Sequence, residues 1–378
     1  MDTLGVGLIG CGNISSIYLN NVPTFQGLEL RGVSDIAPEA AKAQGAKYNV
    51  PVFTVDELLA RDDIDIVINL TIPDVHLAVS MDILRVGKHV YSEKPLGIDF
   101  AEAKKMVAEA DKRGLCIGCA PDTFLGAGGR LSRKLIDDGL VGDILSGTVF
   151  IMSHGHEHWH PNPGFFYKHG GGPVFDMCPY YIHALVNLLG PVKCVRSIAT
   201  TGFAERTVSA DGPLKGKKVA VETPTTMHAL LEFISGANIM LGASWDVWAH
   251  GHLPIELYGT KGSIRVPDPN FFGGAVETLI GREDWVKHQT ASMPMGALNW
   301  PLDKPDRANY RSLGIAEIAA KVRSGSPQRV SGNLALHTLE VMIAIVDGNA
   351  DGTPVEIATQ IPQPAVLAED DAQALFAV

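Results

Sequence analysis

The first 120 residues alternate short apolar runs with amphipathic segments, and this alternation constrains the fold more than any other feature of the chain. The apolar runs have the length and composition of buried strands, and the segments between them have the period of helices. Strands that alternate with helices form a parallel, doubly wound sheet with helices on both faces. The expected strands lie at 4–10, 28–35, 64–71, 89–93 and 115–121, and the expected helices after the first lie at 37–48, 55–61, 74–87 and 99–114.

A glycine loop joins the first expected strand to a helical pattern that ends near Pro23. In VGLIGCGNIS, Gly10 makes the tight turn, Gly12 lets the backbone approach a pyrophosphate, and the small Ser15 allows close helix packing. The second expected strand ends in Asp35, where a carboxylate would accept hydrogen bonds from the adenosine ribose and repel a 2′-phosphate. The pattern predicts a Rossmann domain and favours NAD over NADP. The alternative for Asp35 is a cap of the following helix.

The length of the chain indicates two domains, because 378 residues exceed what one core usually organises. We place the boundary where the pattern changes, with a NAD-binding domain at 1–122 and a substrate-binding and oligomerisation domain at 123–378. The formal charge of -11 arises from 31 basic and 42 acidic residues without a basic block, which argues against nucleic acid and membrane partners. A small polar ligand fits better.

The cysteines and the N-terminus favour a cytoplasmic location. Five cysteines are few and odd in number, as expected in a reducing compartment. Cys116 and Cys119 form a C-x-x-C, but the surrounding GLCIGCAP reads as a buried strand, so we expect two structural thiols. The first residues, MDTLGVGLIGCG, lack the pattern of a secretory signal, and no later segment is apolar over the ~18 residues that a membrane span needs.

The second part of the chain is rich in strand patterns separated by turn signals. Successive strands of this kind indicate an antiparallel or mixed sheet. A strand over 144–156 is expected to be followed by others within 192–203, 223–234, 238–250 and 254–266. Helical patterns lie at 129–142, near 307–324 and at 333–347, so this part is expected to be α+β.

The segment GGGPVFDMCPYYIHALVNLLG predicts a helix that carries chemical groups at its start. Gly170 to Gly172 permit unusual dihedral angles, and Asp176 is a good N-cap of a helix that runs to Gly190. Asp176, Tyr180 and His183 are spaced by four and three residues, so they share one helix face. A carboxyl group, a phenol and an imidazole should therefore converge near the positive end of the helix dipole.

Four motifs in order, VGLIGCGNIS, TIPDVH, GKHVYSEKPL and GGGPVFDMCPYYIHALVNLLG, resemble the Gfo/Idh/MocA family of sugar and polyol oxidoreductases. The resemblance covers most of the chain. It implies a Rossmann domain followed by a domain built on a large, mostly antiparallel sheet that often mediates dimers or tetramers, so we expect a homodimer or homotetramer. It also implies that Glu93 and Lys94 lie beside the nicotinamide ribose. The candidate cofactor-binding residues are Gly10, Gly12, Asn13, Ile14, Asp35, Thr71, His76, Glu93 and Lys94.

The family usually has Asp, then His four residues on, then Asp three further, whereas this chain has Asp176, Tyr180 and His183. Tyrosine occurs at the second position in some members. We hypothesise that hydride leaves the carbinol carbon while Tyr180 takes the hydroxyl proton, assisted by the ammonium of Lys94. His183 is the competing base because its reference pKa lies near neutrality. The candidate catalytic residues are Lys94, Asp176, Tyr180 and His183.

A run of histidines at every second position, His154 to His160 in MSHGHEHWHP, precedes this helix. On a strand, all four imidazoles would project to one side. Three interpretations remain open: a metal site aided by His250 and His252, surface or interface histidines, and a wall of the polyol pocket, which we favour because the inferred hydride chemistry needs no metal. The candidate substrate-binding residues are Asp122, His156, Trp159 and His160.

The function predicted is NAD-dependent oxidation or reduction at a secondary alcohol of a sugar, inositol or related polyol. Two other classes carry the same resemblance: NAD-dependent glycosidases, which oxidise and re-reduce a bound sugar, and non-catalytic NAD-binding regulators. The retention of Lys94 together with Asp176 and Tyr180 favours an enzyme. Neither the sugar nor the oxidised carbon follows from the sequence.

Overall fold

The first sheet of the protein is parallel and has its strands in the order β2-β1-β3-β4-β5. The computed structural model describes residues 3–348 and 352–376. The strand order reverses between β1 and β3, which places a ligand crevice at the carboxyl ends of these two strands. The elements are β1 (Leu4–Ile9), α1 (Ser15–Asn21), β2 (Leu28–Ser34), α2 (Pro38–Tyr48), α3 (Val55–Leu59), β3 (Ile66–Asn69), α4 (His76–Arg85), β4 (His89–Ser92), α5 (Phe100–Arg113) and β5 (Ile117–Cys119).

Burial and capping explain why these residues form these elements. Every residue of β3 is buried, because helices cover both faces of a parallel sheet. At α5, Asp99 accepts a hydrogen bond from the amide of Glu102, and Gly114 ends the helix in the left-handed conformation. All five cysteines are buried and free, which agrees with structural thiols at Cys116 and Cys119.

The second sheet has nine strands in the order β15-β14-β13-β12-β6-β11-β10-β7-β16. Its pairs are antiparallel except for β11 and β6, which run parallel. The strands are β6 (Ile144–Met152), β7 (Val192–Thr200), β10 (Thr226–Phe233), β11 (Asn238–Ser244), β12 (Ile255–Gly259), β13 (Gly262–Val266), β14 (Val276–Ile280), β15 (Val286–His288) and β16 (Val355–Glu356), with a separate hairpin of β8 (Glu205–Thr207) and β9 (Lys218–Ala220).

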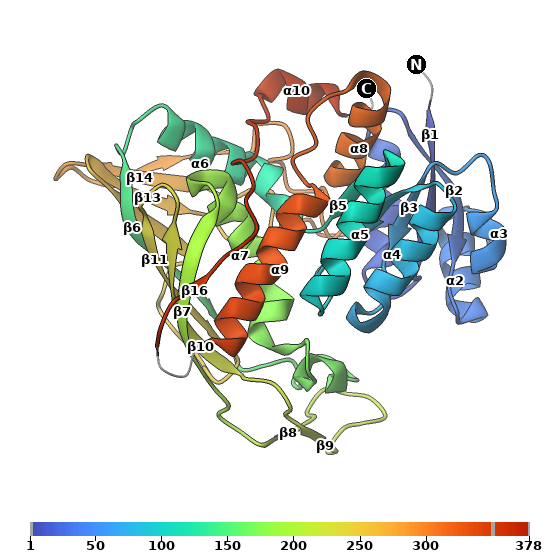
Figure 1. The fold of residues 1–378 in the computed structure, drawn as a ribbon, viewed down its shortest axis with the longest axis horizontal. Helices are drawn as coiled ribbons and strands as arrows, with labels where there is room; N and C mark the ends of the chain where they lie inside the picture. Colours follow the sequence, from blue (N-terminus) through green and yellow to red (C-terminus); the bar gives the residue numbers. More distant parts are fainter. Residues whose placement is uncertain (1–2, 349–351, 377–378) are drawn as a thin grey trace.

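Helices of the second part lie between the two sheets (Figure 1). α6 (Ala127–Asp137), α7 (Gly172–Leu189) and α9 (Gly332–Asp347) pack on one face of the nine-stranded sheet, and α9 also contacts α5 and β5. α8 (Leu313–Ser324) contacts β4 and β5 of the first sheet, where a Cβ on Gly314 would lie 2.5 Å from the ring of Tyr91. α10 (Glu369–Ala374) follows near the C-terminus. Helices late in the sequence therefore complete the layers around the first sheet.

The predicted fold class is confirmed: a doubly wound Rossmann sheet is followed by a large, mostly antiparallel sheet with helices. Several expected elements differ in extent; for example, the strand expected within 238–250 ends at Ser244. The strand expected over 144–156 ends at Met152, the helix expected near 307–324 begins at Leu313, and the run 254–266 is a hairpin of β12 and β13. Within the described residues, no helix is long and apolar enough to span a membrane.

Candidate active site

The glycine loop between β1 and α1 has the open backbone that a pyrophosphate needs. Gly10 has a φ angle of +103°, and a Cβ on it would lie 2.5 Å from the carbonyl oxygen of Leu70, so only glycine fits. Gly12, Asn13 and Ile14 are exposed, and no described atom lies within 4 Å of the position of a Cβ on Gly12. The loop therefore fits the phosphates of a dinucleotide beside the start of α1.

Asp35 joins the end of β2 to this loop. One carboxylate oxygen accepts a hydrogen bond from the amide of Cys11 and the other accepts one from the amide of Ala37, each at 2.7 Å. Residue Ala37, not Asp35, is the N-cap of α2, so the alternative interpretation of Asp35 as that cap is wrong. The carboxylate is held at the glycine loop, where it was expected to meet the ribose.

Two predicted cofactor residues brace the loops that follow β3 and β4. His76 is 1% exposed, and its ring nitrogens each lie 2.8 Å from a backbone carbonyl oxygen, of Thr71 on one side and Pro95 on the other. Thr71 donates from its hydroxyl to Asn69 at 2.6 Å. Because both ring nitrogens of His76 contact backbone carbonyl oxygens, the ring braces these two loops, and its place among the cofactor-binding residues stays a prediction.

Glu93 is buried at the carboxyl end of β4. Its two carboxylate oxygens accept hydrogen bonds from the Tyr18 hydroxyl at 2.8 Å and from the amide of Lys94 at 2.9 Å. Glu93 therefore fixes the backbone from which the Lys94 side chain starts.

Lys94 follows β4 of the first sheet, Asp176 lies on α7, and the two form an ion pair. The Nζ atom of Lys94 lies 2.7 Å from Oδ1 of Asp176 and 2.6 Å from its carbonyl oxygen. Burial alone would lower the pKa of Lys94, but the negative charge of Asp176 outweighs it and raises that pKa above its ordinary value. Burial alone would raise the pKa of Asp176, but Lys94 and His156 hold it well below its usual range. Both groups are therefore charged near neutral pH.

Asp176 lies inside α7, so its predicted role as the N-cap is wrong. The helix begins at Gly172, with Pro173 in its first turn and Pro179 inside it. Proline is favoured at the first helical positions because the missing N–H would have no partner there, and Gly172 and Pro173 provide that start before Asp176 is reached.

Tyr180 lies one turn beyond Asp176, between two cations. Its hydroxyl accepts a hydrogen bond from Arg311 at 3.2 Å, and the Nζ atom of Lys94 lies 5.5 Å from the centre of its ring. Arg311 also donates to side-chain oxygens of Asn270 at 3.0 Å and Asn309 at 2.8 Å. Burial alone would lower the pKa of Arg311, but the adjoining tyrosines and Glu93 raise it, so the guanidinium stays charged.

His183 does not reach this group, so its predicted role as the competing base is wrong. It is 1% exposed, its Nδ1 lies 3.0 Å from the carbonyl oxygen of Pro121, and its ring packs edge-on against Phe124. Burial lowers its pKa to about 4. The spacing gave the correct helix face, but two helical turns carry His183 roughly 10 Å along the axis from Asp176.

Asp122 is a structural residue, so its predicted contact with the substrate is wrong. It is fully buried, and Oδ2 accepts hydrogen bonds from the amides of Ser312 and Gly314 at 3.0 Å each. These amides stand at the start of α8, whose first N–H groups lack partners within the helix. The carboxylate therefore fastens α8 to the end of β5.

The histidine run leaves the sheet after β6, and its imidazoles do not share one side. His156 places Nε2 2.8 Å from Oδ2 of Asp176, so it joins the Lys94 pair. His154 stacks on Trp248 with ring centres 3.3 Å apart, and His158 is exposed. No three His, Cys, Asp or Glu side chains gather as a metal site within 3–348 and 352–376.

Aromatic side chains surround His156 on the side away from Asp176. Trp159 donates from its indole nitrogen to Nδ1 of His156 at 3.1 Å and is 51% exposed. The ring of His160 lies 5.4 Å from that of Phe166, which in turn lies 4.3 Å from the ring of His156. Three of the four predicted substrate-binding residues, His156, Trp159 and His160, therefore lie together near Asp176.

Arg311 is the residue of this site that the sequence did not reveal. It stands in the irregular segment NYRS just before α8, with no spacing that links it to the motif of Tyr180. Its only local signal is a charged side chain beside an apolar helix. The hydrogen bond between Arg311 and Tyr180 depends on the packing of α8 against the first sheet, and a local sequence pattern does not predict that packing.

Comparison with known proteins matches most of the chain to one family. Residues 4–120 match the Gfo/Idh/MocA oxidoreductase family with its NAD-binding Rossmann fold, and residues 130–265 match the Gfo/Idh/MocA C-terminal domain. An inositol 2-dehydrogenase of Rhizobium meliloti (strain 1021) is 26% identical over 371 residues, which cover 94% of this chain and 100% of that one.

Two further relatives share a name. A levoglucosan dehydrogenase of Pseudarthrobacter phenanthrenivorans is 26% identical over 294 residues, covering 70% of this chain and 73% of that one. A solved structure of levoglucosan dehydrogenase in complex with NADH and L-sorbose superposes with a TM-score of 0.79 at 22% identity, covering 96% of this chain and 100% of that chain. At this identity the structural likeness supports the fold alone.

Proposed function

Because the chain belongs to the Gfo/Idh/MocA family of NAD-binding oxidoreductases, we propose that it is a dehydrogenase acting on a secondary alcohol of a sugar, inositol or related polyol. The observation that carries this proposal is the convergence of Lys94, which follows β4, with Asp176 and Tyr180 of α7 at the ligand edge of the first sheet. The names of relatives, an inositol dehydrogenase and a levoglucosan dehydrogenase, agree with it.

Bound NAD would supply the hydride acceptor for the carbinol carbon. In the proposed reaction the residues of the chain handle the hydroxyl group: Tyr180 takes its proton, and the Lys94 ammonium stabilises the oxygen as negative charge develops on it. The Arg311 guanidinium, 3.2 Å from the Tyr180 hydroxyl, stabilises the anionic form of the phenol before the transfer. Asp176 keeps the Lys94 ammonium in place. The alcohol becomes a ketone, and one proton is left on Tyr180.

The test is NADH formation by purified protein with NAD and a panel of inositols, aldoses and anhydrosugars. We expect stoichiometric NADH with at least one of them, and Tyr180→Phe should lower kcat about 100- to 10,000-fold while NAD still binds. Tyr181→Phe is the matched control, because the Tyr181 hydroxyl contacts Asp268 at 3.3 Å instead of Arg311. Unchanged turnover in Tyr180→Phe would refute the role of Tyr180.

The same panel separates the other two function classes. Sugar release without net NADH would indicate a glycosidase, and tight NAD binding without turnover on any polyol would indicate a regulator. The preference for NAD over NADP and the cytoplasmic location stay predictions. Comparing the dissociation constants of NAD and NADP tests the first of them.

The homo-oligomeric state is also proposed. The face of the nine-stranded sheet that lies opposite α7 and α9 carries exposed apolar side chains on adjacent strands, namely Ile198 on β7, Leu230 on β10 and Met240 on β11, which are 71%, 53% and 41% exposed. A second copy covering this face would remove them from water.

A further inference from the structure

The contacts of His156 reveal how its ring carries its proton. The indole nitrogen of Trp159 lies 3.1 Å from Nδ1 of His156, and an indole N–H can only donate. Nδ1 must therefore accept, which leaves the proton of a neutral imidazole on Nε2. Nε2 lies 2.8 Å from Oδ2 of Asp176, so it donates to that carboxylate, while Lys94 donates to Oδ1 at 2.7 Å. The hydrogen bonds run in one direction from Trp159 to Asp176.

We infer that Trp159 is a positioning residue whose indole N–H keeps His156 neutral with its proton on Nε2, so that Lys94 remains the one cation paired with Asp176. This inference rests on the proposed function for its consequence, because it is there that the Lys94 ammonium acts on the reacting hydroxyl. The hydrogen-bond directions themselves follow from the side chains alone.

Two aromatic rings pack against the His156 ring and support this role. The centre of the ring lies 4.3 Å from that of Phe166 and 4.5 Å from that of Trp245, with interplanar angles of 66° and 56°. Turning the ring by 180° about its Cβ–Cγ bond would put carbon atoms where Nδ1 and Nε2 now stand, so the hydrogen bonds to Trp159 and Asp176 would both be lost. The Trp159 side chain is itself 51% exposed, so the indole lies partly in solvent.

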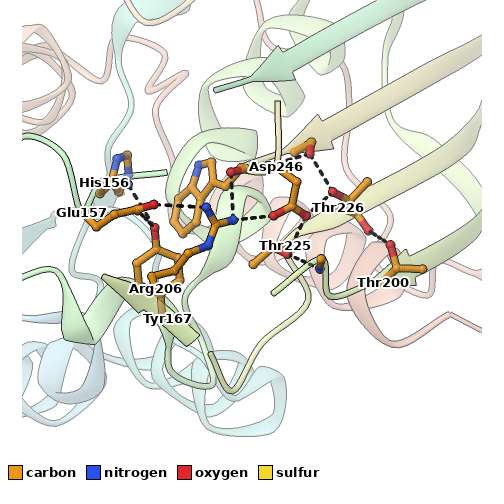
Figure 2. Close-up of polar contacts among 11 residues, drawn as sticks. His156, Glu157, Tyr167, Thr200, Arg206, Thr225, Thr226 and Asp246 are labelled. Atoms are coloured by element: carbon orange, nitrogen blue, oxygen red, sulfur yellow. Dashed lines mark hydrogen bonds and ion pairs between the residues drawn. The ribbon is translucent and has the colours of Figure 1, made fainter. Parts of the chain in front are cut away.

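The backbone of His156 is held independently, as Figure 2 shows. Its amide donates to the Tyr167 hydroxyl at 3.1 Å, and that hydroxyl donates to Glu157. Arg206 pairs with both Glu157 and Asp246, and Asp246 accepts hydrogen bonds from Thr225 and Thr226. Figure 2 shows this network leading from the His156 loop to the strand that bears Thr226. The network fixes the position of the His156 backbone, and the Trp159 indole determines which ring nitrogen of His156 carries the proton.

The charged groups around His156 all have partners that keep them in place. On α7, Asp176 faces Nε2 with Lys94 behind it, and on the loop itself His160 contacts the same Phe166. Glu157 and Asp246 both form ion pairs with Arg206. Without the indole donor, the carboxylate of Asp176 would favour a second proton on His156, and an imidazolium would then compete with Lys94 for Asp176.

The experiment is ¹⁵N NMR of histidine-labelled full-length protein at neutral pH, without cofactor or substrate. His156 is assigned among the 13 histidines by comparison with His156→Asn. We expect a protonated Nε2 and an unprotonated Nδ1 in the parent protein, and two protonated nitrogens in Trp159→Phe. Trp248→Phe is the matched control, because Trp248 stacks on His154 and not on His156; it should keep the parent pattern.

Several outcomes overturn the inference. A proton on Nδ1 of His156 in the parent protein would do so without any variant, and so would a parent-like pattern in folded Trp159→Phe or the same change in Trp248→Phe. In turnover assays, Trp159→Phe should lower kcat about fivefold, the value of one ordinary hydrogen bond, with the KM for NAD unchanged. The NMR result stands even if no polyol is oxidised, so failure of the proposed function and failure of this inference are distinguishable.

Discussion

At the residue scale, the chain shows which parts of a site local pattern can predict. Lys94 and Asp176 were both predicted from motifs, and the structure pairs their side chains at 2.7 Å. Lys94 lies at the ligand edge of the parallel sheet, and Asp176 lies on α7. The spacing of His183 was as regular as that of Tyr180. Spacing predicts which helix face a side chain lies on, but not how deeply it is buried. His183 contacts Pro121 and Phe124 and does not reach Lys94.

The pair of Lys94 and Asp176 should make stability depend on acid pH. A carboxyl group whose pKa is lowered in the folded state stabilises the protein above its ordinary pKa of about 3.9, and this contribution is lost as the pH falls below that value. Lys94→Met removes the cation from a pair whose side chains are 16% and 14% exposed, and should lower the free energy of unfolding at neutral pH by about 3 kcal/mol.

Urea denaturation at a series of pH values measures this effect. The gap in unfolding free energy between parent and Lys94→Met should narrow as the pH falls from about 5 toward 3, because Asp176 then becomes protonated more readily in the variant. Lys42→Met is the control, since its pair with Glu39 is fully on the surface and should change little. A gap that stays constant over this range would show that the charge of Asp176 does not depend on Lys94.

At the element scale, the histidine run shows how a period of two can mislead. Alternating histidines fit a strand, but β6 ends at Met152 and the run continues as turns through the glycine and prolines that follow. Gly155 has a φ angle of +79°, which an extended strand does not contain. What alternates here are polar side chains, whereas a half-buried strand needs alternating apolar ones, and that distinction was available in the sequence.

Adding a side chain at Gly155 should destabilise the protein for two reasons, its positive φ angle and a collision with neighbouring side chains, and the two effects can be measured separately. A Cβ on Gly155 would collide with the Tyr167 hydroxyl and the Glu157 carboxylate, the two groups that hold the His156 backbone. Gly87 has a similar φ angle of +82° and nothing within 4 Å of its Cβ position among the described residues. Gly87→Ala should therefore cost about 1 kcal/mol of stability from backbone strain alone.

Gly155→Ala should cost about 2 to 4 kcal/mol, because it adds the collision to the same strain. Thermal unfolding of both variants gives the comparison, and kcat on the identified polyol should fall only in Gly155→Ala. Equal losses of stability in the two variants would mean that the side chains of Tyr167 and Glu157 move to accommodate the added methyl group. Their contacts would then not constrain the loop.

At the scale of the whole molecule, the sequence predicted two sheets but not how they share helices. The alternation of strands and helices predicted the first sheet, and turn-rich strand patterns predicted the second. That α8 and α9 would pack against β5 could not be predicted, since contacts across about 200 residues leave no local periodicity. Arg311 escaped notice for the same reason, because it reaches Tyr180 only through this long return.

The open face of the second sheet should set the oligomeric state. Leu230 and Met240 are directly paired across β10 and β11, so replacing both with glutamate places two charges at the centre of the apolar face. We expect the parent to sediment as a dimer or tetramer and the double variant as a monomer with unchanged helix content. Val322→Glu, at a 41% exposed position on α8, is the control and should not alter the assembly. A parent that is already monomeric would refute the proposed oligomer.

The division of the chain at residues 122 and 123 stays a prediction, and the contacts of α8 and α9 indicate what a separated first part would lack. In the intact chain Tyr91 is fully buried and Ile117 is 5% exposed; a Cβ on Gly314 would press on the ring of Tyr91, and one on Gly332 would lie 3.0 Å from Ile117. Fragment 1–122 keeps every strand of the first sheet but exposes these side chains, so its folding should lose cooperativity.

Circular dichroism during thermal unfolding of fragment 1–122 tests this, with the intact chain as reference. We expect a broad, weakly cooperative transition for the fragment, and recovery of NAD binding when fragment 123–378 is added, because that fragment returns α8 and α9 to the sheet. A sharp transition together with NAD binding by 1–122 alone would show the opposite. The first sheet would then be an independent domain that α8 and α9 cover without being needed to fold it.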